Sequence, residues 1–361
     1  MAVAQQQRQL IPFRLGTRQR FQPVATVNVA DNSRQSVILP RVGFLSHVFV
    51  QIDATVTNTP GTGSISFAPL GPWNLLRSVT VRTNLGTAIL YRTSGWTNYL
   101  VQRLTGDNLD PAAAGDSFVY AASTAAGDQA LRLPYVIPIA ANLGDDFVTG
   151  LYLLQSPEVQ VTVDLEFGAL VGDAFTVSGG ATVVYKTGTQ PVARVGYLYY
   201  EVPDPNRVMY PPLTLHRIIE DELPISSAGD VIWQLPREGL VLRLGRTLLN
   251  NTPARSDAVT EFVLRANRTD EIYRIRQWEQ RYLQLYRYGA PLPSGVYVHD
   301  LWAARNEGSP GWGDVRDAID SEAIATVEDI TRLDSTFTPG SNAKMVVWRE
   351  FLQAVALGGA R

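Results

Sequence analysis

The sequence predicts an all-β chain built from two copies of one β module. Stretches rich in β-branched and aromatic residues recur along it, separated by glycine, proline, asparagine and aspartate, which is typical of antiparallel strands. The clearest of these stretches are residues 26–30, 48–56, 78–82, 159–167 and 181–185. Strands and helices do not alternate regularly, which disfavours a parallel sheet with helices on both faces.

One helix is predicted in each half of the chain. Residues 94–104 and 276–286 each place a tryptophan, a tyrosine and a leucine at helical spacing. Such a stripe normally faces a sheet, so we expect both helices to cap or flank one. Tryptophan often contributes to binding at interfaces, but at this spacing a core role is the better interpretation for both Trp96 and Trp278.

The predicted β module is duplicated, because five short motifs occur twice in the same order. The pairs are Leu39-Pro-Arg41-Val-Gly43 with Leu235-Pro-Arg237-Glu-Gly239, Arg82-Thr-Asn84 with Arg265-Ala-Asn267, Tyr91-Arg92 with Tyr273-Arg274, Trp96 with Trp278, and Gly106 with Gly289. The first pair is 196 residues apart, and the others are 182 or 183 apart. Self-similarity at a fixed separation indicates an internal repeat.

Each module has the pattern of a jelly roll, with about eight short strands, a flanking helix and long loops. The fold class is therefore all-β, with two jelly-roll β-barrels in tandem and a short flanking helix in each. The expected organisation is a basic N-terminal arm (1–21), a first jelly roll (22–202), a proline-rich linker (203–212) and a second jelly roll with a C-terminal tail (213–361). The prolines of the linker predict a stiff, extended connector.

Composition limits the possible functions. Cysteine is absent, so disulfides and thiolate chemistry are excluded. The three histidines, His47, His216 and His299, are too scattered for a zinc site, and we expect no metal or cofactor. No apolar run is long enough to span a bilayer, and no signal peptide is evident. Only 18% of residues are charged, which suggests a surface largely covered by other copies.

The acidic clusters do not predict an enzyme. They are Asp145 and Asp146; Glu220, Asp221 and Glu222; and Asp314, Asp317 and Asp320. A glycosidase needs two carboxylates that face each other across a sugar, but solvated loop charge is the simpler interpretation here. The motifs of phosphate-binding loops, serine hydrolases and zinc proteases do not occur.

The N-terminal arm is the first candidate site. It carries Arg8, Arg14, Arg18 and Arg20, and no acidic residue precedes Asp31. Its field is locally positive, so it could contact an anionic surface, either lipid headgroups or genome. The apolar residues between the arginines favour docking over a solvated tail, although chain ends are often frayed and without function.

Two further aromatic residues are candidates for contact with another chain. Trp302 and Trp312 lie in a glycine-rich region predicted to be a surface loop. The barrels are expected to begin after the arm, so removal of residues 1–20 should leave them folded.

The duplicated module resembles the double jelly-roll major capsid proteins of tailless icosahedral phages and the adenovirus hexon. The resemblance rests on the paired Arg-x-Asn strands, the Tyr-Arg motifs with their tryptophan helices, and the arginine-rich arm. It implies homotrimers that mimic hexamers, in an icosahedral shell that encloses a genome. The implied partners are neighbouring capsomers, minor capsid or vertex proteins, and internal membrane lipid or genome. The implied location is the virion capsid, with assembly in the host cytoplasm.

Two other functions fit a chain of two jelly rolls. One is a carbohydrate-active or amidase enzyme, which would be expected to carry a signal peptide and convergent acidic and aromatic residues. The other is a receptor-binding virion spike, which would be expected to divide into a dissimilar stalk and head. The two halves of this chain look alike, so a capsid protein is the preferred hypothesis.

Overall fold

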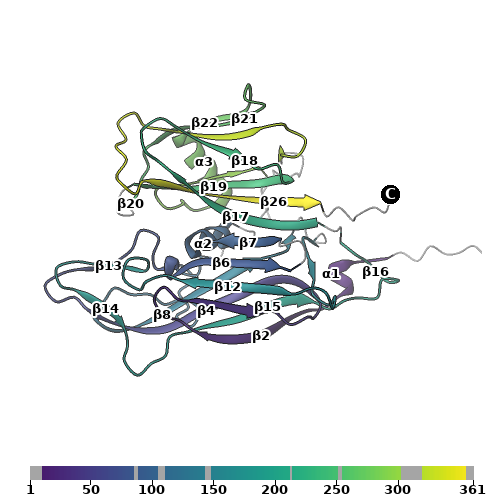
Figure 1. Cartoon of the computed structure of the whole chain (residues 1–361), viewed down its shortest axis with the longest axis horizontal. Coiled ribbons are helices and arrows are strands. Elements are labelled where there is room, and N and C mark those ends of the chain that lie inside the picture. Colours follow the sequence, from purple (N-terminus) through teal and green to yellow (C-terminus); the bar gives the residue numbers. More distant parts are fainter. Residues whose placement is uncertain are drawn as a thin grey trace, which may run out of the picture.

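The computed structural model describes residues 10–84, 88–104, 110–142, 148–211, 214–250, 254–301 and 319–354. These residues form two β-barrels, one above the other in Figure 1. Helix α1 and the end of strand β26 lie at one end of the molecule, and strands β13 and β14 lie at the opposite end (Figure 1).

The first barrel consists of two four-stranded antiparallel sheets, extended at their margins by short strands. One sheet has the order β2 (Gln19–Asn28), β15 (Val192–Tyr200), β4 (Phe44–Thr59) and β8 (Gly127–Pro138). The other has the order β3 (Arg34–Ile38), β12 (Val161–Phe167), β6 (Leu76–Thr83) and β7 (Ile89–Thr93).

The second barrel repeats this arrangement strand for strand. Its first sheet has the order β17 (Thr214–Pro224), β26 (Lys344–Ala354), β19 (Leu240–Asn250) and β23 (Val296–Asp300). Its second sheet has the order β18 (Asp230–Leu235), β25 (Val327–Leu333), β21 (Val259–Ala266) and β22 (Asp270–Arg276).

Both barrels are jelly rolls. Numbered along each barrel, the eight strands pair as 1-8-3-6 in one sheet and 2-7-4-5 in the other, which is jelly-roll connectivity. Helices α2 (Gly95–Leu104) and α3 (Gln277–Tyr288) each follow the fifth strand of their barrel. The predicted fold class and the two flanking helices are therefore confirmed.

The repeated motifs occupy equivalent positions in the two barrels. Each Leu-Pro-Arg motif joins the second strand to the third and ends in a glycine with positive φ, 69° at Gly43 and 119° at Gly239. Strands β4 and β19 each carry a one-residue bulge, directly before His47 and Arg243. These two residues are also 196 apart, so one numerical offset relates equivalent positions along both strands.

The barrels meet through a shared sheet and a shared core. Strand β7 pairs in parallel with β17, where Tyr91 aligns with Ile218, and this joins sheets of both barrels into one of ten strands. The core of the first barrel also contains buried residues of the second, namely Ile218, Leu292, Val296, Val298 and Trp348. The outer face of the β17-β26-β19-β23 sheet therefore packs against the first barrel.

Short elements complete the fold. Near the N-terminus, β1 (Ile11–Pro12) and α1 (Phe13–Gly16) precede β2, and β16 (Val208–Met209) lies in the expected linker. The remaining elements are β5 (Ile65–Phe67), the 3-10 helix η1 (Trp73–Leu75), β9 (Ala141–Asn142), β10 (Val148–Thr149), β11 (Tyr152–Leu153), β13 (Phe175–Val177), β14 (Thr182–Tyr185), β20 (Ala254–Arg255) and β24 (Ile319–Asp320). Among the described residues, no helix is both long and apolar enough to cross a membrane.

Candidate subunit interface

Helix α2 is buried between the two barrels. The indole of Trp96 is 3% exposed, and its Nε1 donates a hydrogen bond to Oγ1 of Thr247 over 3.2 Å. The guanidinium of Arg255 lies 4.9 Å from the centre of the indole ring. Arg103 donates to the carbonyl of Pro291. The prediction that Trp96 is a core residue is confirmed, and the side chain is buried where the two barrels meet.

The N-terminus of α2 is fixed by an acid from the second barrel. The backbone N–H and the hydroxyl of Ser94 donate to Oε2 of Glu220 over 2.9 and 2.8 Å. Burial raises the pKa of Glu220, and hydrogen bonds from Thr97 and Ser94 oppose that rise. Asp221 forms a 2.9 Å ion pair with Arg92 of β7. The interpretation of this cluster as solvated loop charge is therefore wrong for Glu220 and Asp221, which lie on strand β17 and bind across the junction, whereas Glu222 is exposed and pairs with Lys344.

A buried charge cluster lies on the same sheet of the second barrel. Nη1 of Arg243, which is fully buried, lies 2.9 Å from Oε2 of Glu350, and the His216 ring lies 2.9 Å from Oε1. Burial alone would raise the pKa of Glu350, but Arg243 and His216 outweigh it and lower the pKa to about 2. The carboxylate therefore stays charged and holds the guanidinium in place.

Helix α2 faces its own barrel with amide side chains. Nδ2 of Asn98 donates to the carbonyl of Val136 over 2.9 Å and to the hydroxyl of Tyr91 over 2.6 Å. Gln102, one turn later, donates to the Asn98 side chain. This polar face leaves the opposite, apolar face of α2 available to the second barrel.

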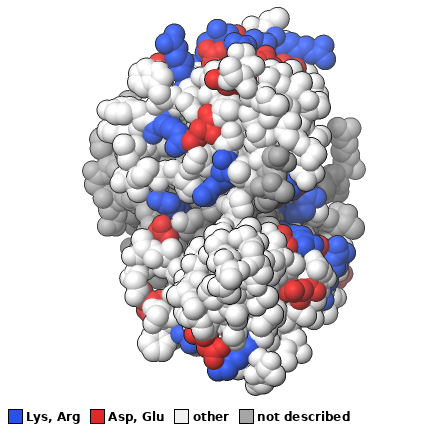
Figure 2. Space-filling model, turned by 90° about the vertical axis from the view of Figure 1, so that its left-hand side faces the viewer, with Lys and Arg blue, Asp and Glu red and all other residues white. Residues whose placement is uncertain are grey.

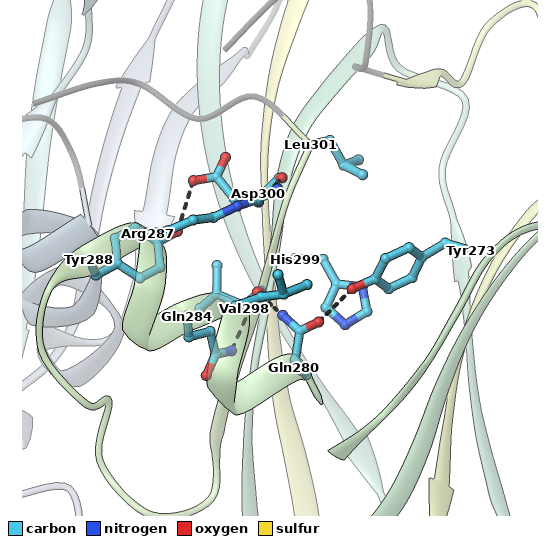
Figure 3. Close-up of a pocket in the computed structure, with 10 residues that line it drawn as sticks. Tyr273, Gln280, Gln284, Arg287, Tyr288, Val298, His299, Asp300 and Leu301 are labelled. Carbon is cyan, nitrogen blue, oxygen red and sulfur yellow. Dashed lines mark hydrogen bonds between the residues drawn. The ribbon is translucent and has the colours of Figure 1, made fainter. Parts of the chain in front are cut away.

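Helix α3 is attached to its barrel in the same way (Figure 3). Gln280 accepts a 2.6 Å hydrogen bond from the hydroxyl of Tyr273 and donates to the carbonyl of Val298. Gln284 also donates to Val298. Tyr273 and Val298 lie on the fifth and sixth strands, as Tyr91 and Val136 do in the first barrel. The attachment of the helix is thus duplicated with the barrel.

The side chains on the opposite face of α3 are exposed in the described part of the chain. We call the stripe formed by Trp278, Tyr282, Leu285 and Tyr286 the α3 face, and its residues are 62%, 64%, 46% and 61% exposed. The prediction that Trp278 is a core residue is therefore wrong. Helical spacing correctly indicated one apolar face, but it did not indicate that Gln280 and Gln284 would be the residues turned towards the barrel.

A small cavity lies beside this attachment. It has a volume of about 50 Å³ and is lined by Tyr273, Gln280, Leu283, Gln284, Arg287, Tyr288, Val298, His299, Asp300 and Leu301 (Figure 3). Burial, with help from Arg246 and Arg287, lowers the pKa of His299 well below its ordinary value. Pockets for drug-sized ligands are commonly about 300–1,000 Å³. The cavity is therefore too small for a sugar or peptide substrate.

The described part of the predicted arm packs on the end of the first barrel beside helix α1, which we call the base of that barrel. Phe13 is buried against Phe44 and Tyr200, with ring centres 5.7 and 5.4 Å away. Strand β1 pairs with β16. The expected boundary at residue 21 falls inside strand β2, so removal of residues 1–20 would also remove the first two residues of that strand.

The predicted contact residues have different surroundings. Arg14 and Arg18 are exposed, and Arg20 forms an ion pair with Glu201. Leu10, Ile11 and Leu15 of the same N-terminal segment are exposed apolar side chains, and so is Met209 on the adjacent strand β16. Arg8, Trp302 and Trp312 lie outside the described residues, as do Asp145, Asp146, Asp314 and Asp317. Within the described ranges, no group of three or more acidic or histidine side chains could hold a metal ion.

Figure 2 shows the end of the molecule opposite helix α1. Charged side chains gather along the upper edge of the second barrel and around the margin of the lower lobe, which is the first barrel, while the centre of that lobe is uncharged in this view (Figure 2).

Comparison with known proteins supports the fold. No family model matches the sequence, and no curated protein matches it. The structure is similar to the major capsid protein of Sulfolobus turreted icosahedral virus, with a TM-score of 0.67 and 16% identity over 94% of this chain and 97% of that one. It is similar to the PBCV-1 virus capsid, with a TM-score of 0.64 and 11% identity over 93% of both chains.

A third similar structure is the major capsid protein P2 of bacteriophage PM2, with a TM-score of 0.52 and 12% identity over 95% of this chain and 100% of that one. The chain therefore has the double jelly-roll fold found in viral major capsid proteins. The predicted resemblance is confirmed at the level of the fold, over nearly the whole chain.

Proposed function

We propose that this chain is a major capsid protein that assembles with copies of itself into an icosahedral shell around a viral genome. The observation that carries the proposal is the double jelly roll itself, which matches capsid proteins along 93–95% of this chain in three structures. A structural role of this kind requires no catalytic residue, metal or cofactor, and its location is the virion.

The duplication favours a trimer. Two barrels with the same topology lie side by side in each chain, so three chains would supply six similar barrels around one axis. Such a trimer would fill a position of sixfold symmetry in a shell. Neighbouring trimers, and minor or vertex proteins, would be its partners.

The base of the first barrel is proposed to face inwards. It combines the exposed Arg14 and Arg18 with the exposed apolar side chains of Leu15 and Met209, a mixture that suits the interface of an anionic bilayer. Arg8 and Arg20 would add to its charge. Packaged genome is the alternative anionic surface.

Light scattering coupled to size-exclusion chromatography tests the proposal. We expect the purified chain to elute with the mass of three chains and to keep that mass on dilution, since the large interfaces of permanent complexes dissociate very little. A folded chain that stays monomeric at micromolar concentration would contradict a capsid role.

A further inference from the structure

Two surfaces meet where the barrels join inside the chain, and the duplicated fold provides an equivalent of each surface in the other barrel. One side is the apolar face of α2, and its counterpart is the α3 face. The other side is the outer face of the β17-β26-β19-β23 sheet, and its counterpart is the outer face of the β2-β15-β4-β8 sheet. In the described residues the α3 face is exposed, whereas the sheet counterpart is partly buried apart from Phe21. On that sheet Nε2 of Gln51 donates to the carbonyl of Phe118, which leaves its Oε1 as an acceptor.

The outer face of the β2-β15-β4-β8 sheet can be read from its register. Phe49 pairs with Gly196 on one side and with Val136 on the other, and Leu198 pairs with Phe21. Directly paired residues share one face of a sheet. We call the residues Phe21, Phe49, Gln51, Pro134, Val136 and Leu198 the first-barrel face. Five of these six residues are apolar. Beyond Gln51 the same face carries Asp53 with Arg132 and Arg194.

Each of the two sheets has an aromatic ring packed on a glycine of the neighbouring strand. The ring of Phe21 fills the space beside Gly196, and that of Trp348 fills the space beside Gly245. Trp348 is 0% exposed because the first barrel covers it, whereas Phe21 is 58% exposed. A ring packed on a glycine is therefore covered in one barrel and exposed in the other, although ring and glycine come from different strands of the two barrels.

We propose that the α3 face of one copy binds the first-barrel face of a second copy, in the way that α2 binds the second barrel within the chain. This inference rests on the proposed self-assembly, and it names the surfaces that would carry it. The contact between copies would repeat the contact between the two barrels of one chain, because each copy has one α3 face and one first-barrel face that are not used within the chain.

The offsets between equivalent residues predict one specific contact. Trp96 donates to Thr247 within the chain. Trp278 lies 182 residues after Trp96, and Gln51 lies 196 residues before Thr247. Trp278 of one copy should therefore place its indole N–H beside Gln51 of the next. An indole needs one acceptor when it is buried, and an amide oxygen can provide it.

The chemistry of the two faces is complementary. The α3 face presents three aromatic side chains and a leucine, and the first-barrel face presents two phenylalanines among other apolar residues. Large buried aromatic residues dominate the binding energy of protein interfaces. Because the two faces differ, the contact is head-to-tail, and repeated rotation can close it into a ring.

A crosslinking experiment tests the predicted contact, because the natural chain has no cysteine. The double variant Gln51→Cys/Trp278→Cys, treated with a short bismaleimide, should give covalent multimers on a denaturing gel. Each single variant should remain one chain. The pair Val184→Cys/Trp278→Cys is the matched control, because Val184 is exposed on β14, outside the first-barrel face, and should give no multimer.

Truncation of the aromatic residues gives an independent readout. The double variant Tyr282→Ala/Tyr286→Ala should lower the fraction of trimer at micromolar concentration at least tenfold. Its circular dichroism should stay that of the folded chain, because both side chains are exposed in a single copy. The control Val184→Ala should remain trimeric.

The outcomes separate this inference from the proposed function. If the natural chain is a trimer but the cysteine pair does not crosslink and the tyrosine variant stays trimeric, the α3 face is not the contact and the capsid role is unaffected. If the natural chain is a monomer, the proposed self-assembly fails first. Multimers from the Val184 control pair would also overturn the inference, since they would show unspecific crosslinking.

Discussion

Helices α2 and α3 follow the same strand of two duplicated barrels, yet Trp96 is 3% exposed and Trp278 is 62% exposed. Both helices use amide side chains to attach to their own barrel. The difference lies entirely in what covers the other face. An apolar stripe on a helix therefore indicates a partner, and the partner can be another barrel rather than the sheet beneath the helix.

The largest difference between the two helices should appear on truncation of the two tryptophans. Trp96→Ala should lower the free energy of unfolding by about 3–5 kcal/mol, because a large side chain is removed from a packed junction. Trp278→Ala should lower it by less than about 1 kcal/mol in a single chain. Urea unfolding in the Tyr282→Ala/Tyr286→Ala background, in which the copies are expected not to assemble, measures both losses. Equal losses there would show that the two helices are not differently covered within the chain.

The charge cluster at the junction should be almost as sensitive. Glu350→Ala leaves Arg243 buried without its 2.9 Å partner, which typically costs about 3–5 kcal/mol. The exposed pair of Arg20 and Glu201 is the control, since Glu201→Ala should cost less than about 1 kcal/mol. Thermal unfolding of both variants measures the two losses in the free energy of unfolding. A small loss for Glu350→Ala would mean that water reaches the junction.

The amide attachments should respond alike in the two barrels. Asn98→Ala leaves the carbonyl of Val136 without its side-chain donor, and Gln280→Ala leaves the carbonyl of Val298 with only the longer bond from Gln284. Each change should cost about 1–3 kcal/mol. Chemical denaturation of the two variants gives the comparison. A large loss for one and none for the other would show that the two attachments are not equivalent.

The smallest effect should be a dependence of stability on pH. The pKa of buried His299 is lowered, so the unfolded chain binds a proton more readily and stability falls as pH drops below about 6.5. The slope is at most about 1.4 kcal/mol per pH unit for one histidine. The pKa of His47 is lowered to about 4, so His47 contributes to the loss of stability over the same pH range. Glu350 contributes to the loss only below its ordinary pKa of 4.5. His299→Leu should flatten part of the loss between pH 6.5 and 4.5, and an unchanged slope would contradict this assignment.

Much of the fold could be predicted from the sequence, because the duplication is visible in short motifs that mark turns and strand ends. Gly43 and Gly239 recur since both turns need a positive φ, and the Tyr-Arg motifs recur since their tyrosines bind a helix amide in each barrel. The site was less predictable. Nothing in the local pattern of Trp278 distinguishes it from Trp96, because burial there depends on a surface 150 or more residues away.

Glu220 shows the same limit. In the sequence it belongs to a run of three acidic residues, which ordinarily lies in water. In the structure it lies on β17 and caps a helix 126 positions earlier in the chain. The burial of Phe13 was also missed, since its partners, Phe44 and Tyr200, come from distant strands. Pairings of this kind depend on topology and leave no local periodicity.

The two barrels are connected at two separated points. Strand β7 hydrogen-bonds to β17 in the middle of the molecule, and the linker that carries β16 crosses from one barrel to the other near helix α1 (Figure 1). Together with the shared core and the bonds of helix α2, these connections spread the contact between the barrels over a wide area, so each chain should behave as a rigid body rather than as two hinged halves. Any curvature of a larger assembly must then arise from the angles between copies.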